Sequence, residues 1–186
     1  VKVAIFDVNA EGGQRLADEI GGVFARVDVS DYASLVAGFE TARAAHGQER
    51  LLVACAGIAP GQKTVSRGAP HAPAMFQRTV AINLTGTFSA ASLSATGMAE
   101  ADPLDVDGTR GVIVMTASVA GIEGQVGQAA YAASKSGVIG LTLPMARDLA
   151  GKGIRVMTIA PGLFRTPMLE GLPDEVQESL GKQVPF

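Results

Sequence analysis

The sequence predicts an α/β protein built on a doubly wound parallel sheet. Two observations carry this prediction: short apolar runs alternate with stretches of helical periodicity, and the runs lack the polar alternation of strands with one face in water. Such runs are typical of parallel strands that helices cover on both faces. The expected strands span residues 1–8, 23–29, 51–57, 112–118 and 154–161. In folds of this kind, ligands bind outside the carboxyl ends of the strands.

Helix-capping residues follow the first two expected strands. Asn9 can cap a helix that runs to about Ile20, where a pair of glycines would end it. Ser30 or Asp31 can cap a second helix over 32–45, in which apolar side chains recur at helical spacing. The chain therefore begins with two strand–helix units.

The middle of the chain is expected to contain two irregular segments around one long helix. Residues 58–73 hold Pro, Gly, Lys and Arg without periodicity, which favours a surface loop. A long helix is expected over 74–98. The acidic, turn-rich segment 100–111 then leads into the fourth strand.

The last third of the chain predicts a helix over 128–150, with Pro144 as a kink inside it. A short helical pattern follows Pro173. No internal repeat is visible, and the length is that of one domain. We therefore expect a single domain over residues 1–186.

Composition excludes several classes of function. The net charge of −3 shows no bias toward nucleic acid, and no apolar run reaches the roughly 18 residues that span a membrane. Cys55 is the only cysteine, so no internal disulfide can form, and a reducing compartment fits. We expect a cytoplasmic protein, or one of the mitochondrial matrix if a targeting segment has been removed.

Three polar residues predict an active site. Tyr131 and Lys135 stand four apart in the expected last long helix, so they share a face of it. Ser118 ends the preceding strand, and a turn can bring it to the same point. A phenol ionises near pH ~10, and a nearby ammonium stabilises the phenolate. The three groups can move a proton to or from an oxygen while a hydride moves at the attached carbon.

Several motifs together resemble the short-chain dehydrogenase/reductase family, and its type II 3-hydroxyacyl-CoA dehydrogenase branch in particular. They are VFARVDVSD, CAGIA, INLTGTF, TASVAG, YAASKSG and IAPGLFRTP. The resemblance implies an NAD-dependent oxidoreductase that interconverts a secondary alcohol and a ketone. The branch implies a small-molecule substrate of the 3-hydroxyacyl-CoA type. It also implies a homotetramer, with the helices around 74–98 and 128–150 in an interface.

The resemblance implies a role for each residue of the catalytic group. Tyr131 is the general acid/base, Ser118 holds the substrate oxygen, and Lys135 also binds the nicotinamide ribose. Asn83 lies inside a helix, where asparagine is unfavourable. The family makes it the anchor of a water that relays protons to the lysine; a hydrogen bond between helices is the alternative.

Further residues are implied on the adenosine side of the cofactor. Asp7 ends the first strand, where a carboxylate accepts bonds from ribose hydroxyls and repels a 2′-phosphate, which favours NAD over NADP. Its alternative role is to cap the next helix. Asp28 and Val29 resemble the pair that flanks the adenine. The turn Cys55-Ala56-Gly57 resembles one that approaches the cofactor sugar.

The nicotinamide and substrate sides are implied by two later segments. Pro161, Gly162, Phe164 and Thr166 resemble the residues that contact the nicotinamide and its carboxamide. Gln125 and Gln128 are expected on the substrate side.

The sequence departs from the family at both ends. Family members open with a strand and a glycine-rich turn that binds the pyrophosphate, and they continue beyond a position like Phe186. The chain thus resembles a family member cut at both ends. Gly121, Gly124 and Gly127 lie between a strand and a helix, but their spacing differs from the dinucleotide fingerprint.

Other interpretations remain open at the level of the sequence. The same chemistry could act on a steroid, sugar or polyol, and the chain could be a non-catalytic scaffold subunit. No metal is predicted, because His46 and His71 lack ligands at suitable spacing. The aspartates at 102, 105 and 107 lack the rest of a calcium loop, which favours a solvated turn.

Overall fold

The computed structural model describes residues 1–164, 171 and 174–182, without the side chains of 176 and 180. It confirms the five predicted strands, all in parallel pairs, with shorter bounds than the apolar runs. They are β1 (Ala4–Asp7), β2 (Val23–Arg26), β3 (Leu51–Ala54), β6 (Gly111–Thr116) and β7 (Ile154–Ile159).

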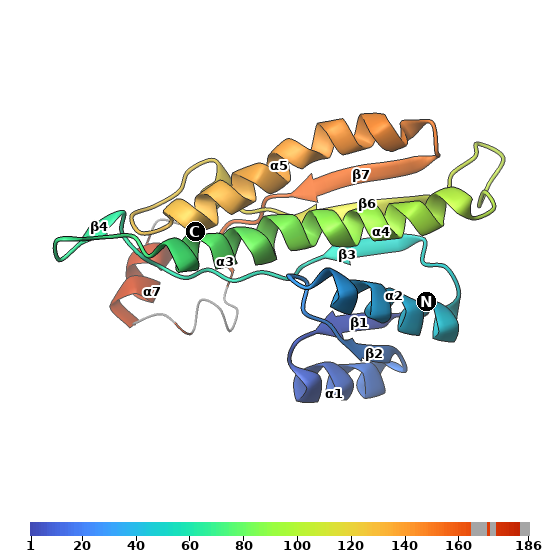
Figure 1. Cartoon of the computed structure of the whole chain (residues 1–186), viewed down its shortest axis with the longest axis horizontal. Helices are drawn as coiled ribbons and strands as arrows, with labels where there is room; N and C mark the ends of the chain where they lie inside the picture. Colours follow the sequence, from blue (N-terminus) through green and yellow to red (C-terminus); the bar gives the residue numbers. More distant parts are fainter. Residues whose placement is uncertain (165–170, 172–173, 183–186) are drawn as a thin grey trace.

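The helices also follow the predicted pattern (Figure 1). Asn9 caps α1 by accepting from the Gly12 N–H, and Asp31 caps α2 by accepting from the Ala33 N–H. The helices are α1 (Ala10–Ile20), α2 (Tyr32–His46), α3 (Pro73–Val80), α4 (Thr87–Glu100), α5 (Ala129–Ala150) and α7 (Asp174–Gly181). None of those the structure describes is long and apolar enough to cross a membrane.

The parallel strands form two separate ladders, β1–β2 and β3–β6–β7. Helices α1 and α2 lie on opposite faces of the first ladder, because Phe24 of β2 meets Gly13 of α1 while Ala25 clusters with Leu35 of α2. The core of the second ladder lies between β6 and β7 on one side and α4 and α5 on the other.

The outer strands of the second ladder carry apolar side chains that are exposed. Leu51 and Val53 of β3 are 57% and 50% exposed, and Met157 and Ile159 of β7 are 47% and 50% exposed. The apolar sequences of β3 and β7 are those of strands covered on both faces. In the described residues, however, helices bury only one face of each of these two strands.

Two local features differ from the sequence-based expectation. Segment 58–73 contains a short antiparallel hairpin of β4 (Val65–Ser66) and β5 (Ala69–Pro70), strands too short to show periodicity. The long helix expected over 74–98 is continuous, but it changes to a π-helical turn, η1 (Ala81–Gly86), between α3 and α4. Asn83 lies within this turn and is fully buried.

Candidate active site

Lys135 anchors the candidate site. Its Nζ donates a hydrogen bond of 2.7 Å to the main-chain carbonyl of Thr116, the last residue of β6. The same nitrogen lies 5.8 Å from the centroid of the Tyr131 ring, one helical turn earlier on α5. The side chain is buried, and this burial lowers the pKa of the Lys135 ammonium from its ordinary value. A charge on Cys55 would act in the opposite direction.

Ser118 follows β6 and begins the short 3₁₀ helix η2 (Val119–Gly121). Its Oγ accepts from the Ala120 N–H at 3.2 Å, so the serine caps the turn in this structure. The turn packs closely on α5, because a Cβ on Gly121 would lie 2.9 Å from the Ser136 nitrogen. Ser118 is thereby held beside the part of α5 that carries the tyrosine and the lysine.

The segment after β7 reaches the same place. The Val119 N–H donates to the Pro161 carbonyl at 2.9 Å, which ties this segment to the Ser118 turn. Gly162 and Phe164 are exposed just beyond it. Thr166 lies outside the described residues.

The Asn83 side chain joins three segments. Its Oδ1 accepts from the Ile58 N–H at 2.8 Å, and its Nδ2 donates to the Ile58 carbonyl and to Ser134 Oγ. These bonds match the alternative of a link between helices, and the predicted water relay stays a prediction. The Cys55-Ala56-Gly57 turn passes close by, since a Cβ on Gly57 would lie 3.3 Å from Asn83 Oδ1 and 3.6 Å from Lys135 Nζ.

Sequence reasoning missed three residues of this arrangement. Thr116 and Ile58 act through their main chains, so no side-chain pattern could identify them. Ser134 accepts from Asn83 and donates to the Tyr131 carbonyl at 2.7 Å. Its place between Ala133 and Lys135, in the motif that carries Tyr131 and Lys135, was the available signal.

The residues predicted for adenosine stand at the carboxyl ends of β1 and β2. Asp7 is exposed, and its Oδ1 accepts from the Asn9 N–H at 2.8 Å, while Asn9 itself caps the helix. Asp28 accepts from the side chain and main chain of Ser30, and these hydrogen bonds lower the pKa of its carboxyl. Val29 packs against Gly86 of η1.

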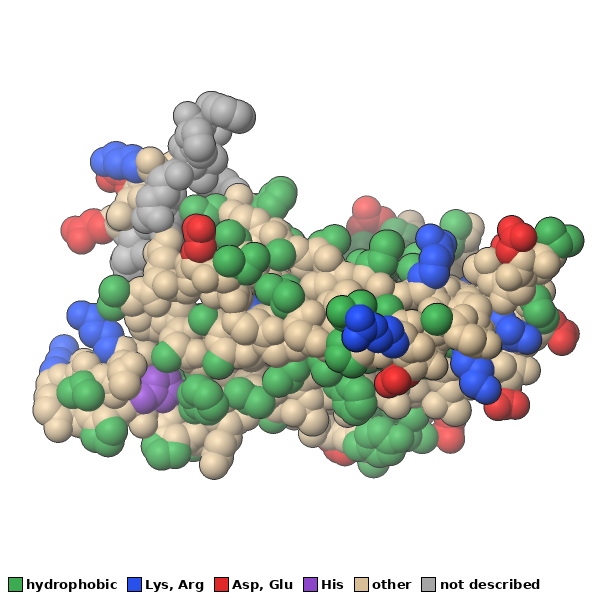
Figure 2. Space-filling model, turned by 90° about the horizontal axis from the view of Figure 1, so that it is seen from above, with side chains coloured by type: hydrophobic (Ala, Val, Ile, Leu, Met, Phe, Trp, Pro, Cys, Tyr) green, Lys and Arg blue, Asp and Glu red, His purple; other side chains and the backbone are tan. Residues whose placement is uncertain are grey.

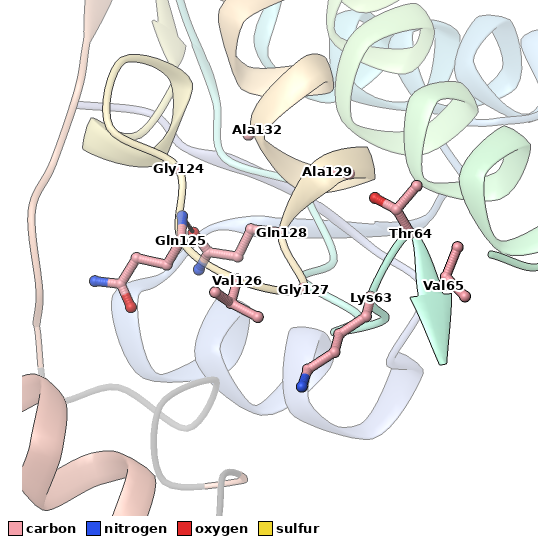
Figure 3. A pocket seen from close by; sticks show the side chains of 10 residues that line it. All are labelled: Lys63, Thr64, Val65, Gly124, Gln125, Val126, Gly127, Gln128, Ala129 and Ala132. Carbon is pink, nitrogen blue, oxygen red and sulfur yellow. Dashed lines mark hydrogen bonds between the residues drawn. The ribbon is translucent and has the colours of Figure 1, made fainter. Parts of the chain in front are cut away.

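Gln125 and Gln128 line a cavity of about 420 Å³, which Ala129 and Ala132 of α5 also line (Figure 3). Figure 3 shows Lys63, Thr64 and Val65 of the hairpin on one side and the loop of the two glutamines on the other. The Gln125 N–H donates to Gln128 Oε1 at 2.9 Å. The cavity thus joins the hairpin to the predicted substrate side.

The acidic segment 100–111 forms a local turn. Asp105 Oδ1 accepts from the N–H groups of Asp107 and Thr109, and these bonds lower the pKa of its carboxyl. Among the described residues, no group of three His, Cys, Asp or Glu side chains is placed to hold a metal ion. The turn needs no ion to explain its geometry.

Comparison with known proteins decides the family. The profile of the short chain dehydrogenases matches residues 1–177. The chain belongs to the short-chain dehydrogenase family. The predictions of family, fold class and enzyme class are therefore confirmed, and membership makes the chain an oxidoreductase that works with a nicotinamide cofactor.

Several short-chain dehydrogenases are similar over nearly the whole chain. The 3-hydroxyacyl-CoA dehydrogenase type-2 of Homo sapiens is 48% identical over 98% of this chain and 71% of its own. The 2-dehydro-3-deoxy-L-rhamnonate dehydrogenase (NAD(+)) of a Sphingomonas strain is 34% identical over 99% and 70%. The crystal structure of a 3-hydroxyacyl-CoA dehydrogenase type-2 from Mycobacterium avium has a TM-score of 0.90 and 44% identity, over 99% of this chain and 72% of that chain.

The residues of this short-chain dehydrogenase fit two parts of a nicotinamide cofactor. The exposed Asp7 carboxylate offers acceptors for ribose hydroxyls at the carboxyl end of β1. Gly57 leaves room next to Lys135 that a Cβ would narrow, so a sugar can approach the ammonium there.

Proposed function

We propose that this protein interconverts a secondary alcohol and a ketone with NAD as cofactor, and that its substrate is a 3-hydroxyacyl-CoA or the matching 3-oxoacyl-CoA. The observation that carries the proposal is the placement of Lys135. Its ammonium is buried, held by the Thr116 carbonyl and set 5.8 Å from the centroid of the Tyr131 ring. Ser118 follows two residues after Thr116, at the start of η2.

Each side chain has a separate task in this proposal. Tyr131 takes the proton from the substrate hydroxyl, or returns it to the ketone oxygen. Ser118 donates a hydrogen bond that holds this oxygen in place. Lys135 stabilises the phenolate and binds the nicotinamide ribose, and Asn83 holds the water of a proton relay. A nicotinamide held by these residues would supply the hydride chemistry at the neighbouring carbon.

The preference for NAD rests on Asp7. Its carboxylate is exposed at the end of β1, where it would repel a 2′-phosphate and accept bonds from ribose hydroxyls. Around it we place Asp28, Val29 and the Cys55-Ala56-Gly57 turn as further cofactor contacts. Pro161, Gly162, Phe164 and Thr166 are proposed at the nicotinamide, and Gln125 and Gln128 at the substrate.

Steady-state kinetics of the intact protein test this proposal. We expect acetoacetyl-CoA to be reduced with NADH and much more slowly with NADPH. Asp7→Asn should narrow the difference between the two cofactors, whereas Asp18→Asn, on the exposed surface of α1, should leave it unchanged. Equal use of NADPH by the unaltered protein would reject the assignment to NAD.

The similarity to a dehydrogenase named for a rhamnonate derivative favours a second candidate substrate, the ketone of a sugar acid. The site chemistry is the same, so only the substrate panel separates the two. Acyl-CoA, sugar-acid and steroid ketones would be ranked by kcat/KM. Calorimetry with NADH excludes the scaffold alternative if the intact protein binds it.

We also propose a homotetramer with α3, α4 and α5 in an interface. These helices expose large apolar side chains, among them Phe76, Phe88 and Leu143 at 40%, 46% and 56%. Figure 2 looks down from the α5 side of Figure 1, and hydrophobic side chains are spread across that face. Light scattering should show a smaller assembly for Leu143→Glu, and an unchanged one for Leu16→Glu on α1. A monomeric unaltered protein would reject the tetramer.

A further inference from the structure

Gln62 is bonded in two directions at the base of the β4–β5 hairpin. Its main-chain N–H donates to the Gly127 carbonyl at 2.9 Å. Its side-chain Oε1 accepts from the Ala72 N–H, also at 2.9 Å. The residue is half-buried. One glutamine therefore connects the entry of the hairpin to its exit and to the loop that precedes Tyr131.

The bond to Ala72 closes the hairpin. Gln62 lies just before the hairpin, and Ala72, ten residues later, lies just after it. Ala72 is also the residue directly before α3. Within this closure, the His71 N–H donates to the Thr64 carbonyl at 2.8 Å. The Gln62 side chain thus makes the outermost of these bonds across the base of the hairpin.

The main-chain bond to Gly127 holds the hairpin close to the loop over residues 124–129, which contains Gln125 and Gln128. Gly127 has a φ of +84°, a conformation that suits glycine, and a Cβ there would lie 3.7 Å from the Gln62 nitrogen. The two segments of the chain therefore approach closely at Gln62 and Gly127. The cavity of about 420 Å³ lies between them, lined by Lys63–Val65 on the hairpin and by 124–129 on the loop.

We propose that Gln62 is a positioning residue for the substrate cleft, because its side chain closes the base of the hairpin on Ala72 while its main-chain N–H ties the closed hairpin to the loop of Gln125 and Gln128 at Gly127. The inference rests on the proposed function, since the substrate is taken to enter this cavity. Gln62 touches no reacting atom in this scheme. It acts through the hairpin, so its loss weakens substrate binding and leaves the chemical step at Tyr131 intact.

Three variants of the intact protein separate this role from general packing. Gln62→Ala removes the acceptor for Ala72, and Gln62→Asn draws it back by one methylene. Gln62→Glu keeps an oxygen at the same reach. Losing one neutral hydrogen bond predicts a KM for acetoacetyl-CoA that rises about 3- to 10-fold in the Ala and Asn variants. We expect kcat to change less than about 2-fold and the Glu variant to recover the original KM.

Limited proteolysis supplies a readout that does not depend on activity. Trypsin can cut after Lys63 and Arg67, which are both exposed on the hairpin. Cleavage at these two sites, followed by mass spectrometry, should be faster in Gln62→Ala than in the unaltered protein. Gln14→Ala, on the exposed surface of α1, is the matched control and should change neither cleavage nor kinetics.

The outcomes distinguish the two proposals. If the unaltered protein turns over acetoacetyl-CoA but Gln62→Ala keeps its KM, or loses kcat instead, the role of Gln62 is overturned. If the unaltered protein does not turn over this substrate while Gln62→Ala is cut faster, the clasp stands and the assigned substrate fails. An equal cleavage rate in both proteins would also overturn the clasp.

Discussion

At the scale of single residues, Lys135 shows how burial shapes the site. Its ammonium is enclosed by β6, α5 and the turn after β3, and the Thr116 carbonyl is its hydrogen-bond acceptor. The sequence predicted the pairing of Tyr131 with Lys135, because residues four apart share a helix face. It could not predict the acceptor, since any residue can supply a main-chain carbonyl.

The buried lysine makes stability depend on pH. Its pKa is lowered in the folded protein, so unfolding takes up a proton between this lowered pKa and the ordinary value. The stability contributed by Lys135 therefore rises with pH across that range. Urea unfolding from about pH 7 to about pH 10 should show the unaltered protein gaining free energy of unfolding relative to Lys135→Met. A difference that is constant with pH would contradict this.

Asn83 allows a second test at this scale. Removing its side chain leaves the half-buried main-chain N–H and carbonyl of Ile58 without their partners. We expect Asn83→Ala to lower the free energy of unfolding by about 1–3 kcal/mol, measured by chemical denaturation. If stability were unchanged while turnover fell, the water relay would be the main role of Asn83 and the helix-linking role would be wrong.

At the scale of elements, the sequence predicted what depends on local patterns. The caps at Asn9 and Asp31 lie next to their helices, and the strands are marked by apolar runs. The hairpin and the π-helical turn were missed for different reasons. The hairpin strands have two residues each, and η1 accompanies bonds from Asn83 to residues 25 and 51 positions away.

The turn η2 depends on close packing against α5. A Cβ on Gly121 would lie 2.9 Å from the Ser136 nitrogen and 3.0 Å from the Lys135 carbonyl carbon, so Gly121→Ala must push the turn away. We expect a loss of about 1–3 kcal/mol in stability, together with lower turnover because Ser118 moves. Gly151→Ala, in open space at the end of α5, is the control and should not destabilise. Equal thermal stability of the two variants would show that the contact is unimportant.

At the scale of the whole molecule, the two ladders are the main finding. The sequence predicted a parallel sheet that lacks the family's first strand, and β1–β2 makes no ladder bond to β3–β6–β7 among the described residues. The residues proposed for adenosine follow the first ladder, and the catalytic group follows the second. The affinity for a cofactor that spans both groups therefore depends on how firmly the two ladders are held together.

This arrangement predicts weak cofactor binding by the 186-residue chain on its own. Its sheet has open edges, and exposed apolar residues such as Val53 and Ile159 lie on the outer strands. The sequence also lacks a glycine-rich turn for the pyrophosphate. Isothermal titration calorimetry of this chain with NADH should give little or no heat of binding. Tight binding with one site per chain would show that the two ladders suffice.

The central claim is that Tyr131 moves the proton in a site shared with Ser118 and Lys135. The most direct measurement is the kcat of Tyr131→Phe in the intact protein, with acetoacetyl-CoA and NADH. Tyr32→Phe is the matched control, because Tyr32 is the only other tyrosine and is exposed on α2. The account predicts a fall of about 100-fold or more for Tyr131→Phe and no change for Tyr32→Phe. Near-normal turnover by Tyr131→Phe would contradict it.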